Sequence, residues 1–282
     1  IDETQILLRD SPLKLLEVAE NGDVQEFQRL LSADRLSLLV WDDKGRTAAH
    51  LAASKNHVGI LKIIAKIETQ FGDPDEDGNT PLHFAVDSEA VDAISFILTH
   101  GADGDVLNKK LQSPLHLAAE LGRVTSLKAL ANHSSLLDVN LPGECGRTPL
   151  HSACIQDQPE CVKILIEELG ASPHVACSDS VLPVHDAAKY GSWNALGALL
   201  SSAEKFDCPV EEMLNFQDVD GNVALHFALQ SRDIKTVQLC LESGAKISAT
   251  QNDLSTAVHL ACAQGSTEIV KLMFTLQPEE KA

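Results

Sequence analysis

The sequence predicts an all-α protein, a solenoid of about eight stacked helix-turn-helix repeats with short finger loops. The first observation is a recurring seven-residue phrase, of which TPLHFAV at 80–86 is the clearest copy. Its histidines follow one another at spacings of 33, 33, 35, 34, 41 and 33 residues. The second is an apolar segment with helical spacing after each copy, such as ECVKILIEEL at 160–169. A fixed period of this length is typical of arrays in which each repeat buries its apolar face against its neighbours.

The phrase itself encodes the start of the first helix in each repeat. Thr80 is a good N-cap, because its hydroxyl can accept from the open amides of the first turn. Pro81 follows at the first helical position, where a missing N–H costs nothing. Leu82 begins the buried stripe, and an alanine pair such as Ala118–Ala119 lets the next helix approach closely.

The second helix of a repeat ends in Gly-Ala, as at 101–102, 170–171 and 244–245. Turn sequences such as DEDGN and DVDGN then predict a finger before the next phrase. We expect a lead-in over residues 1–12 and an array over 13–282, with one degenerate repeat (LLEVAENGDVQEFQRLL at 15–31) and seven recognisable ones. The repeat at 182–222 carries about eight additional residues. The last helix lacks the Gly-Ala ending, so we expect the C-terminal end of the array to be truncated.

The seven histidines raise the question of a metal site. Equivalent side chains of stacked helices lie about 10 Å apart, whereas ligands of one zinc ion lie within about 2.3 Å of it. We therefore expect a structural role, with hydrogen bonds to backbone and to the capping residue, and no metal, cofactor or catalytic site. The histidines concerned are His50, His83, His116, His151, His185, His226 and His259.

The seven cysteines form no CxxC pair, which favours reduced thiols in a cytosolic chain. Cys145 lies in a finger two residues before Arg147, where exposure and positive charge could favour the thiolate. Two further loop cysteines, Cys177 and Cys208, complete the candidate modifiable thiols. The others stand at packed helix positions, so we expect buried apolar side chains at Cys154, Cys161, Cys240 and Cys262.

Composition and charge limit the classes of partner that we expect for this chain. The chain has 41 acidic and 22 basic residues, a formal net charge of −19, and no basic cluster, so a nucleic-acid partner is not expected. No apolar run reaches the ~20 residues of a membrane helix, and no sequence signature of an enzyme is present. We expect a non-enzymatic segment that binds protein.

The repeats resemble ankyrin repeats, because they have a 33-residue period and carry the sequence motif T-P-L-H-x-A. Three stretches make the resemblance more specific: the eroded opening SPLKLLEVAENGDVQEF at 11–27, the lengthened repeat at 182–222 (the sixth when the degenerate repeat is counted) and the closing TAVHLACAQGSTEIVKLM at 256–273. Together they resemble the N-terminal ankyrin region of TRPA-type transient receptor potential channels.

That resemblance implies a regulatory or interaction segment of a tetrameric, calcium-permeable sensory cation channel gated by electrophiles or temperature. The segment would lie on the cytoplasmic side of the plasma membrane and contact other channel regions, other subunits or cytosolic regulators. The alternative is a soluble cytosolic scaffold that binds a protein through its concave face.

Overall fold

The computed structural model describes residues 13–33, 38–67, 71–203 and 209–277. The chain divides into two compact units, residues 1–138 and 139–282. Within the described residues the regular structure is helical, apart from a single antiparallel bridge between Thr250 and Thr256. The predicted all-α class is confirmed.

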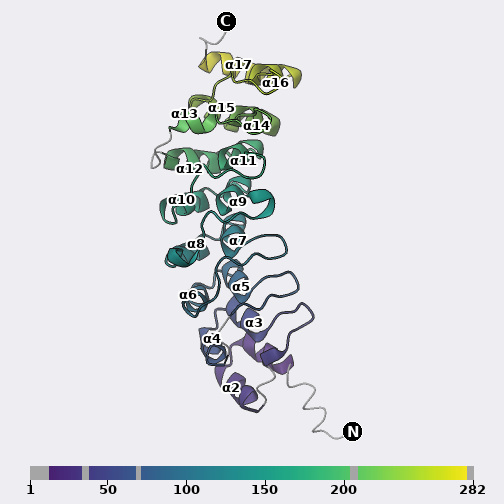
Figure 1. Ribbon diagram of the computed structural model, residues 1–282, viewed down its shortest axis with the longest axis vertical. Helices are drawn as coiled ribbons and strands as arrows, with labels where there is room; N and C mark the ends of the chain where they lie inside the picture. Colours follow the sequence, from purple (N-terminus) through teal and green to yellow (C-terminus); the bar gives the residue numbers. More distant parts are fainter. Residues whose placement is uncertain (1–12, 34–37, 68–70, 204–208, 278–282) are drawn as a thin grey trace. The chain divides into compact units, whose positions relative to one another are not determined.

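The first unit consists of helix pairs stacked in two columns (Figure 1). The first helices of successive pairs pack as α3 on α5 on α7, and the second helices as α2 on α4 on α6 on α8. A helix at residues 13–21 precedes α2. The bounds are α2 (Val24–Ala33), α3 (Ala48–Ser54), α4 (Val58–Ile64), α5 (Pro81–Asp87), α6 (Val91–Thr99), α7 (Pro114–Leu121), α8 (Val124–Ala131) and the 3-10 turn η2 (Ser134–Leu136).

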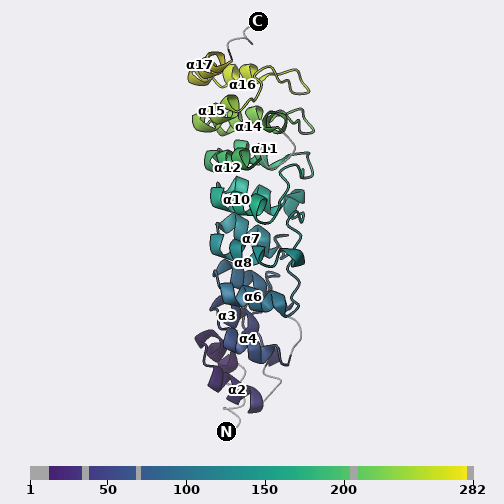
Figure 2. The same cartoon turned by 90° about the vertical axis from the view of Figure 1, so that its left-hand side faces the viewer.

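The second unit repeats this arrangement, with α9, α11, α14 and α16 in one column and α10, α12, α15 and α17 in the other (Figures 1 and 2). The lengthened repeat uses its additional residues to form α13, which packs against α11. The bounds are η3 (Glu144–Gly146), α9 (Pro149–Ile155), α10 (Pro159–Glu167), α11 (Pro183–Lys189), α12 (Trp193–Ala203), α13 (Val210–Leu214), α14 (Ala224–Ser231), α15 (Ile234–Glu242), α16 (Ala257–Ala263) and α17 (Thr267–Leu276).

The core of each unit is built from small aliphatic side chains. Leu115, Ala118 and Ala119 on α7 are fully buried, as are Ala187 and Ala188 on α11. Alanine at these positions lets the backbones of successive first helices come close. The first position of the pair is alanine in all seven phrases, whereas the second also holds Val86, Cys154, Leu229 and Cys262.

The ends of the second helices follow the sequence prediction. Gly101 and Gly170 have φ of +84° and +74°, the left-handed conformation that a C-terminal glycine adopts without steric cost. The amide of Ala171 donates to the carbonyl of Leu165 at 2.7 Å and so satisfies one of the last carbonyls of α10.

One burial prediction was wrong. Cys154, Cys161 and Cys240 are buried as expected, but Cys262 is exposed. Cys154 on α9 is covered by α11 of the next repeat, whereas α16 contacts α14 and α17 and leaves the Cys262 side chain in solvent. This position is buried only where the first helix of a following repeat packs against it, and the seven residues of the phrase do not indicate that contact.

Candidate protein-binding surface

Each of the seven phrases places its histidine at the third position of a first helix, where it closes the helix start. The backbone N–H of the N-cap donates to the histidine Nδ1, as from Thr80 to His83 at 3.1 Å. The Thr80 hydroxyl lies 3.0 Å from the same nitrogen. The hydrogen bond from the N-cap backbone N–H to Nδ1 is present even where the N-cap has no hydroxyl, as from Leu182 to His185 at 3.0 Å. The histidine therefore takes the part that glutamate plays in a capping box.

The other ring nitrogen reaches the next repeat. Nε2 lies 3.0 Å from a backbone carbonyl oxygen in each of three equivalent pairs, His50 to Asn79, His83 to Gln112 and His151 to Val181. In each pair the carbonyl belongs to the residue before the next N-cap. In the lengthened repeat, His185 bonds instead to the carbonyl of Phe216, also at 3.0 Å, because the additional residues bring a different carbonyl against α11.

These partners fix the tautomer. Nδ1 accepts an amide hydrogen and Nε2 faces an oxygen, so the ring is neutral with its hydrogen on Nε2. Burial lowers the pKa of His83 and of His185 to about 4, and it lowers the pKa of His50 in the same direction. Protonation of Nδ1 would place its N–H against the backbone N–H of the N-cap, so that two donors would face each other.

The fingers carry a side-chain cap of their own. Oδ1 of Asp75 accepts the amides of Asp77 and Asn79 at 2.9 and 2.7 Å, and Asp42 and Asp218 make the equivalent pairs of bonds. Asn108 does the same through its amide oxygen. An Asp or Asn five residues before the N-cap is the sequence signal for this cap.

Successive fingers are joined by a backbone ladder. We number the five finger residues from the one that stands five places before the N-cap. The carbonyl oxygen of the third residue in one finger accepts a hydrogen bond from the backbone N–H of the second residue in the next finger. Lys109 N–H donates to Asp77 O at 2.9 Å in the first unit, and Ser178 N–H to Cys145 O at 3.0 Å in the second. The ladder uses no side-chain atom, so the finger tips are held in register whatever residues they carry.

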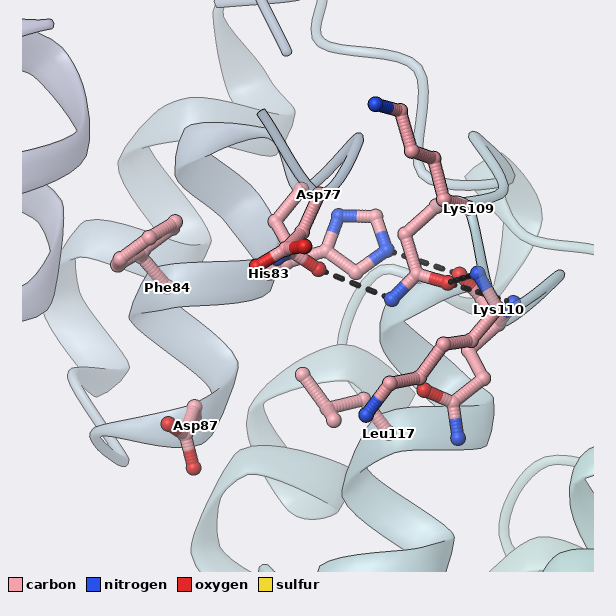
Figure 3. Close-up of a pocket in the computed structure, with 10 residues that line it drawn as sticks. Asp77, His83, Phe84, Asp87, Lys109, Lys110 and Leu117 are labelled. Atoms are coloured by element: carbon pink, nitrogen blue, oxygen red, sulfur yellow. Dashed lines mark hydrogen bonds between the residues drawn. The ribbon is translucent and has the colours of Figure 1, made fainter. Parts of the chain in front are cut away.

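A cavity of about 180 Å³ lies between two fingers and the helices α5 and α7. Phe84 and Leu117 form its apolar part, and both are half-buried. Figure 3 shows Lys110 extending towards Leu117, with Lys109 pointing away. A cavity of 150 Å³ in another protein accommodates benzene, so this one has room for a single large side chain.

Charges of both signs surround this cavity. Asp77, Asp87, Lys109 and Lys110 contribute to its lining. Asp87 binds Arg123 at 2.9 Å, whereas the two lysines form no ion pair within the described part of the chain. The site therefore offers an apolar recess beside the ammonium group of Lys110, which suits an anchoring apolar side chain next to an acidic one.

The candidate thiols lie apart from this cavity. Cys145 is exposed at a finger tip with φ of +54°, Cys177 is half-buried in the next finger, and Cys208 lies outside the described residues. The Arg147 guanidinium expected to act on Cys145 donates to the buried carboxylate of Asp186 at 2.9 and 3.2 Å. Its charge is thus largely compensated. Burial raises the pKa of the Cys154 thiol, and that of Cys240 to about 12, so neither supplies a thiolate near neutral pH.

Two further properties concern the described residues as a whole. They contain no group of three or more His, Cys, Asp or Glu side chains placed to hold a metal ion. Among them, too, no helix has the length and apolar character needed to cross a membrane.

The comparison with known protein families follows the repeat pattern. The family described as ankyrin repeats (3 copies) matches residues 15–108, 98–177 and 184–281. The chain belongs to the ankyrin-repeat family. The predicted ankyrin solenoid is thereby confirmed as the fold.

The individual relatives include two cation channels and Inversin. The chain is 49% identical over 266 residues to transient receptor potential cation channel subfamily A member 1 of Drosophila melanogaster, which covers 94% of the chain and 22% of that protein. Identity to the human protein of the same name is 32% over 208 residues, 73% of the chain and 18% of that protein. Inversin from dog is 27% identical over 200 residues, 70% of the chain and 15% of that protein. The chain thus spans about a fifth of the length of the two channel relatives.

Proposed function

We propose that the chain is the cytoplasmic ankyrin segment of a calcium-permeable sensory cation channel, where it has a regulatory or interaction role and no enzymatic activity. The observation that supports this most is the identity of 49% to a subfamily A channel over 94% of the chain. Ankyrin repeats bind protein, so the partners would be other regions or subunits of a tetrameric channel, or cytosolic regulators. Electrophiles or temperature would be the stimulus.

The cavity over α5 and α7 is the surface we assign to this role. It combines an apolar recess formed by Phe84 and Leu117 with the free ammonium group of Lys110. A partner segment that inserts one apolar side chain there and places a carboxylate beside Lys110 would be recognised by both contacts. The finger loops, held by their ladder, would keep the recess in shape before the partner arrives.

The test expresses the full-length protein that contains this chain in cultured cells and records whole-cell current. We expect a cation current in the plasma membrane, carried in part by calcium. Replacing Phe84 and Leu117 together by serine should change the response to stimulus while surface expression stays the same. Tyr190→Ser, an exposed apolar residue of the second unit, is the matched control.

The alternative is a soluble scaffold that binds a protein through the same cavity. It is favoured if the full-length protein stays in the soluble fraction and carries no current. Loss of partner binding in the Phe84 and Leu117 variant would then still identify the surface.

A further inference from the structure

A second groove lies in the first unit, between the segments that lead into the first two fingers. Its volume is about 730 Å³, and Leu38, Leu39 and Trp41 line it from one segment and Asp73, Pro74 and Glu76 from the other. The two fingers that follow are tied together by the Glu76 N–H donating to Lys44 O at 2.9 Å. The groove is therefore bounded by backbone whose spacing is fixed.

The apolar wall of this groove is unusually exposed. Trp41 and Leu39 have 65% and 62% of their surface in solvent, while Leu38 beside them is buried and anchors the segment. Aromatic residues make up only 4% of the chain, and Trp41 is one of two tryptophans. The next repeat carries Pro74 at the equivalent place before its finger. A tryptophan in water gains more than other side chains from being covered, because it combines a large apolar area with an N–H that stays satisfied at a rim.

The opposite wall is acidic. Among the described residues, no lysine or arginine lines the groove, whereas three carboxylates do. Asp75 is already engaged by the amides of its own finger. The carboxylates of Asp73 and Glu76 are exposed, and within the described residues neither forms an ion pair. Lys44 and Arg46 flank the lining residue Gly45, but neither basic side chain lines the groove, and Arg46 is paired with Asp42 at 2.6 Å.

We propose that this groove binds a short protein segment in which an apolar or aromatic side chain is flanked by lysine or arginine. The apolar side chain packs on Trp41 and Leu39, and the basic groups pair with Asp73 and Glu76. A cation over the indole face adds to the attraction. The charge argument excludes an acidic segment and an anionic lipid surface, and the net charge of −19 acts in the same direction. This inference stands independently of the channel function and of the cavity over α5 and α7.

The test selects random peptides of about ten residues, displayed on phage, against the chain. We expect enriched sequences to hold Lys or Arg next to an aromatic or aliphatic residue. Synthetic peptides of those sequences should bind about tenfold more weakly to Trp41→Ser and to the double variant Asp73→Asn, Glu76→Gln. Leu254→Ser, which removes a still more exposed apolar side chain from the finger of the last repeat, should leave their affinity unchanged.

A spectroscopic readout locates the contact. Trp193→Phe leaves Trp41 as the single tryptophan, and its emission should shift to shorter wavelength when the peptide binds. Circular dichroism checks that each variant keeps its helix content, which we expect because the replaced side chains are exposed.

Three results would overturn the proposal. One is that no peptide is enriched, or that the enriched peptides are acidic. Another is equal binding to Trp41→Ser and to the parent chain. The third is concentration-dependent self-association that Trp41→Ser abolishes, which would make a second copy of the chain the occupant.

Discussion

The buried ion pair between Arg147 and Asp186 allows a prediction whose magnitude depends on which partner is removed. Asp186 stands on α11 where other phrases hold Leu51, Phe84 or Leu117, and it is fully buried. Arg147, at the end of a finger, keeps 29% of its side chain in solvent. Replacing Arg147 by methionine leaves a buried carboxylate without its guanidinium, so the free energy of unfolding should fall by about 3–5 kcal/mol.

The reverse replacement should be mild. Asp186→Leu puts a residue natural to this position on α11, and the arginine can turn towards water. We expect a change of about 1 kcal/mol or less, and the double variant should resemble Asp186→Leu. Arg46→Met is the matched control, because its partner Asp42 still accepts two amides of its finger; its cost should be about 1 kcal/mol or less.

The measurement is urea unfolding of the four variants, followed by circular dichroism at neutral pH. The reasoning is refuted if Asp186→Leu destabilises the chain more than Arg147→Met does. It is refuted equally if Arg147→Met costs no more than Arg46→Met.

Three further predictions concern histidines and thiols. His116→Ala removes a ring that accepts the Ser113 amide at 3.2 Å and should cost roughly 1–3 kcal/mol in urea unfolding, whereas a change within error would contradict the structural role. The folded pKa of His83 and His185, about 4, lies below the ordinary 6.5, so the unfolded chain binds more protons and stability is lost as pH falls from about 6.5 to about 4. At pH 5 the loss should be about 2 kcal/mol per histidine, and a stability independent of pH in this window would argue against neutral rings. Mild alkylation should label the exposed Cys145 and Cys262 before the buried thiols, as followed by mass spectrometry. Early labelling of a buried thiol (Cys154, Cys161 or Cys240) would contradict the packing.

Local sequence accounts for much of the fold. The N-cap, the first-position proline and the Gly-Ala ending each act within one repeat, so they could be recognised from residues close together in the sequence. Thr80, Pro81 and Gly101 take the conformations expected of them because no distant contact competes with these local preferences.

Contacts between repeats were harder to predict. Arg147 and Asp186 are 39 residues apart, and nothing in either local sequence indicates the other. The carbonyl that His185 meets depends on how the additional residues of its repeat fold into α13. The exposure of Cys262 depends on what covers its helix, and the groove beside Trp41 depends on the spacing of two fingers.

The backbone ladder between fingers has a consequence for how such a protein can evolve. Residues at the third finger position include Lys44, Asp77 and Cys145, a base, an acid and a thiol, yet each gives the same carbonyl to its neighbour. Stability is contributed by atoms that every amino acid has, while the side chains at the same positions point to solvent. Mutations there can alter what the surface recognises at little cost to folding, so new partners can be acquired one finger at a time.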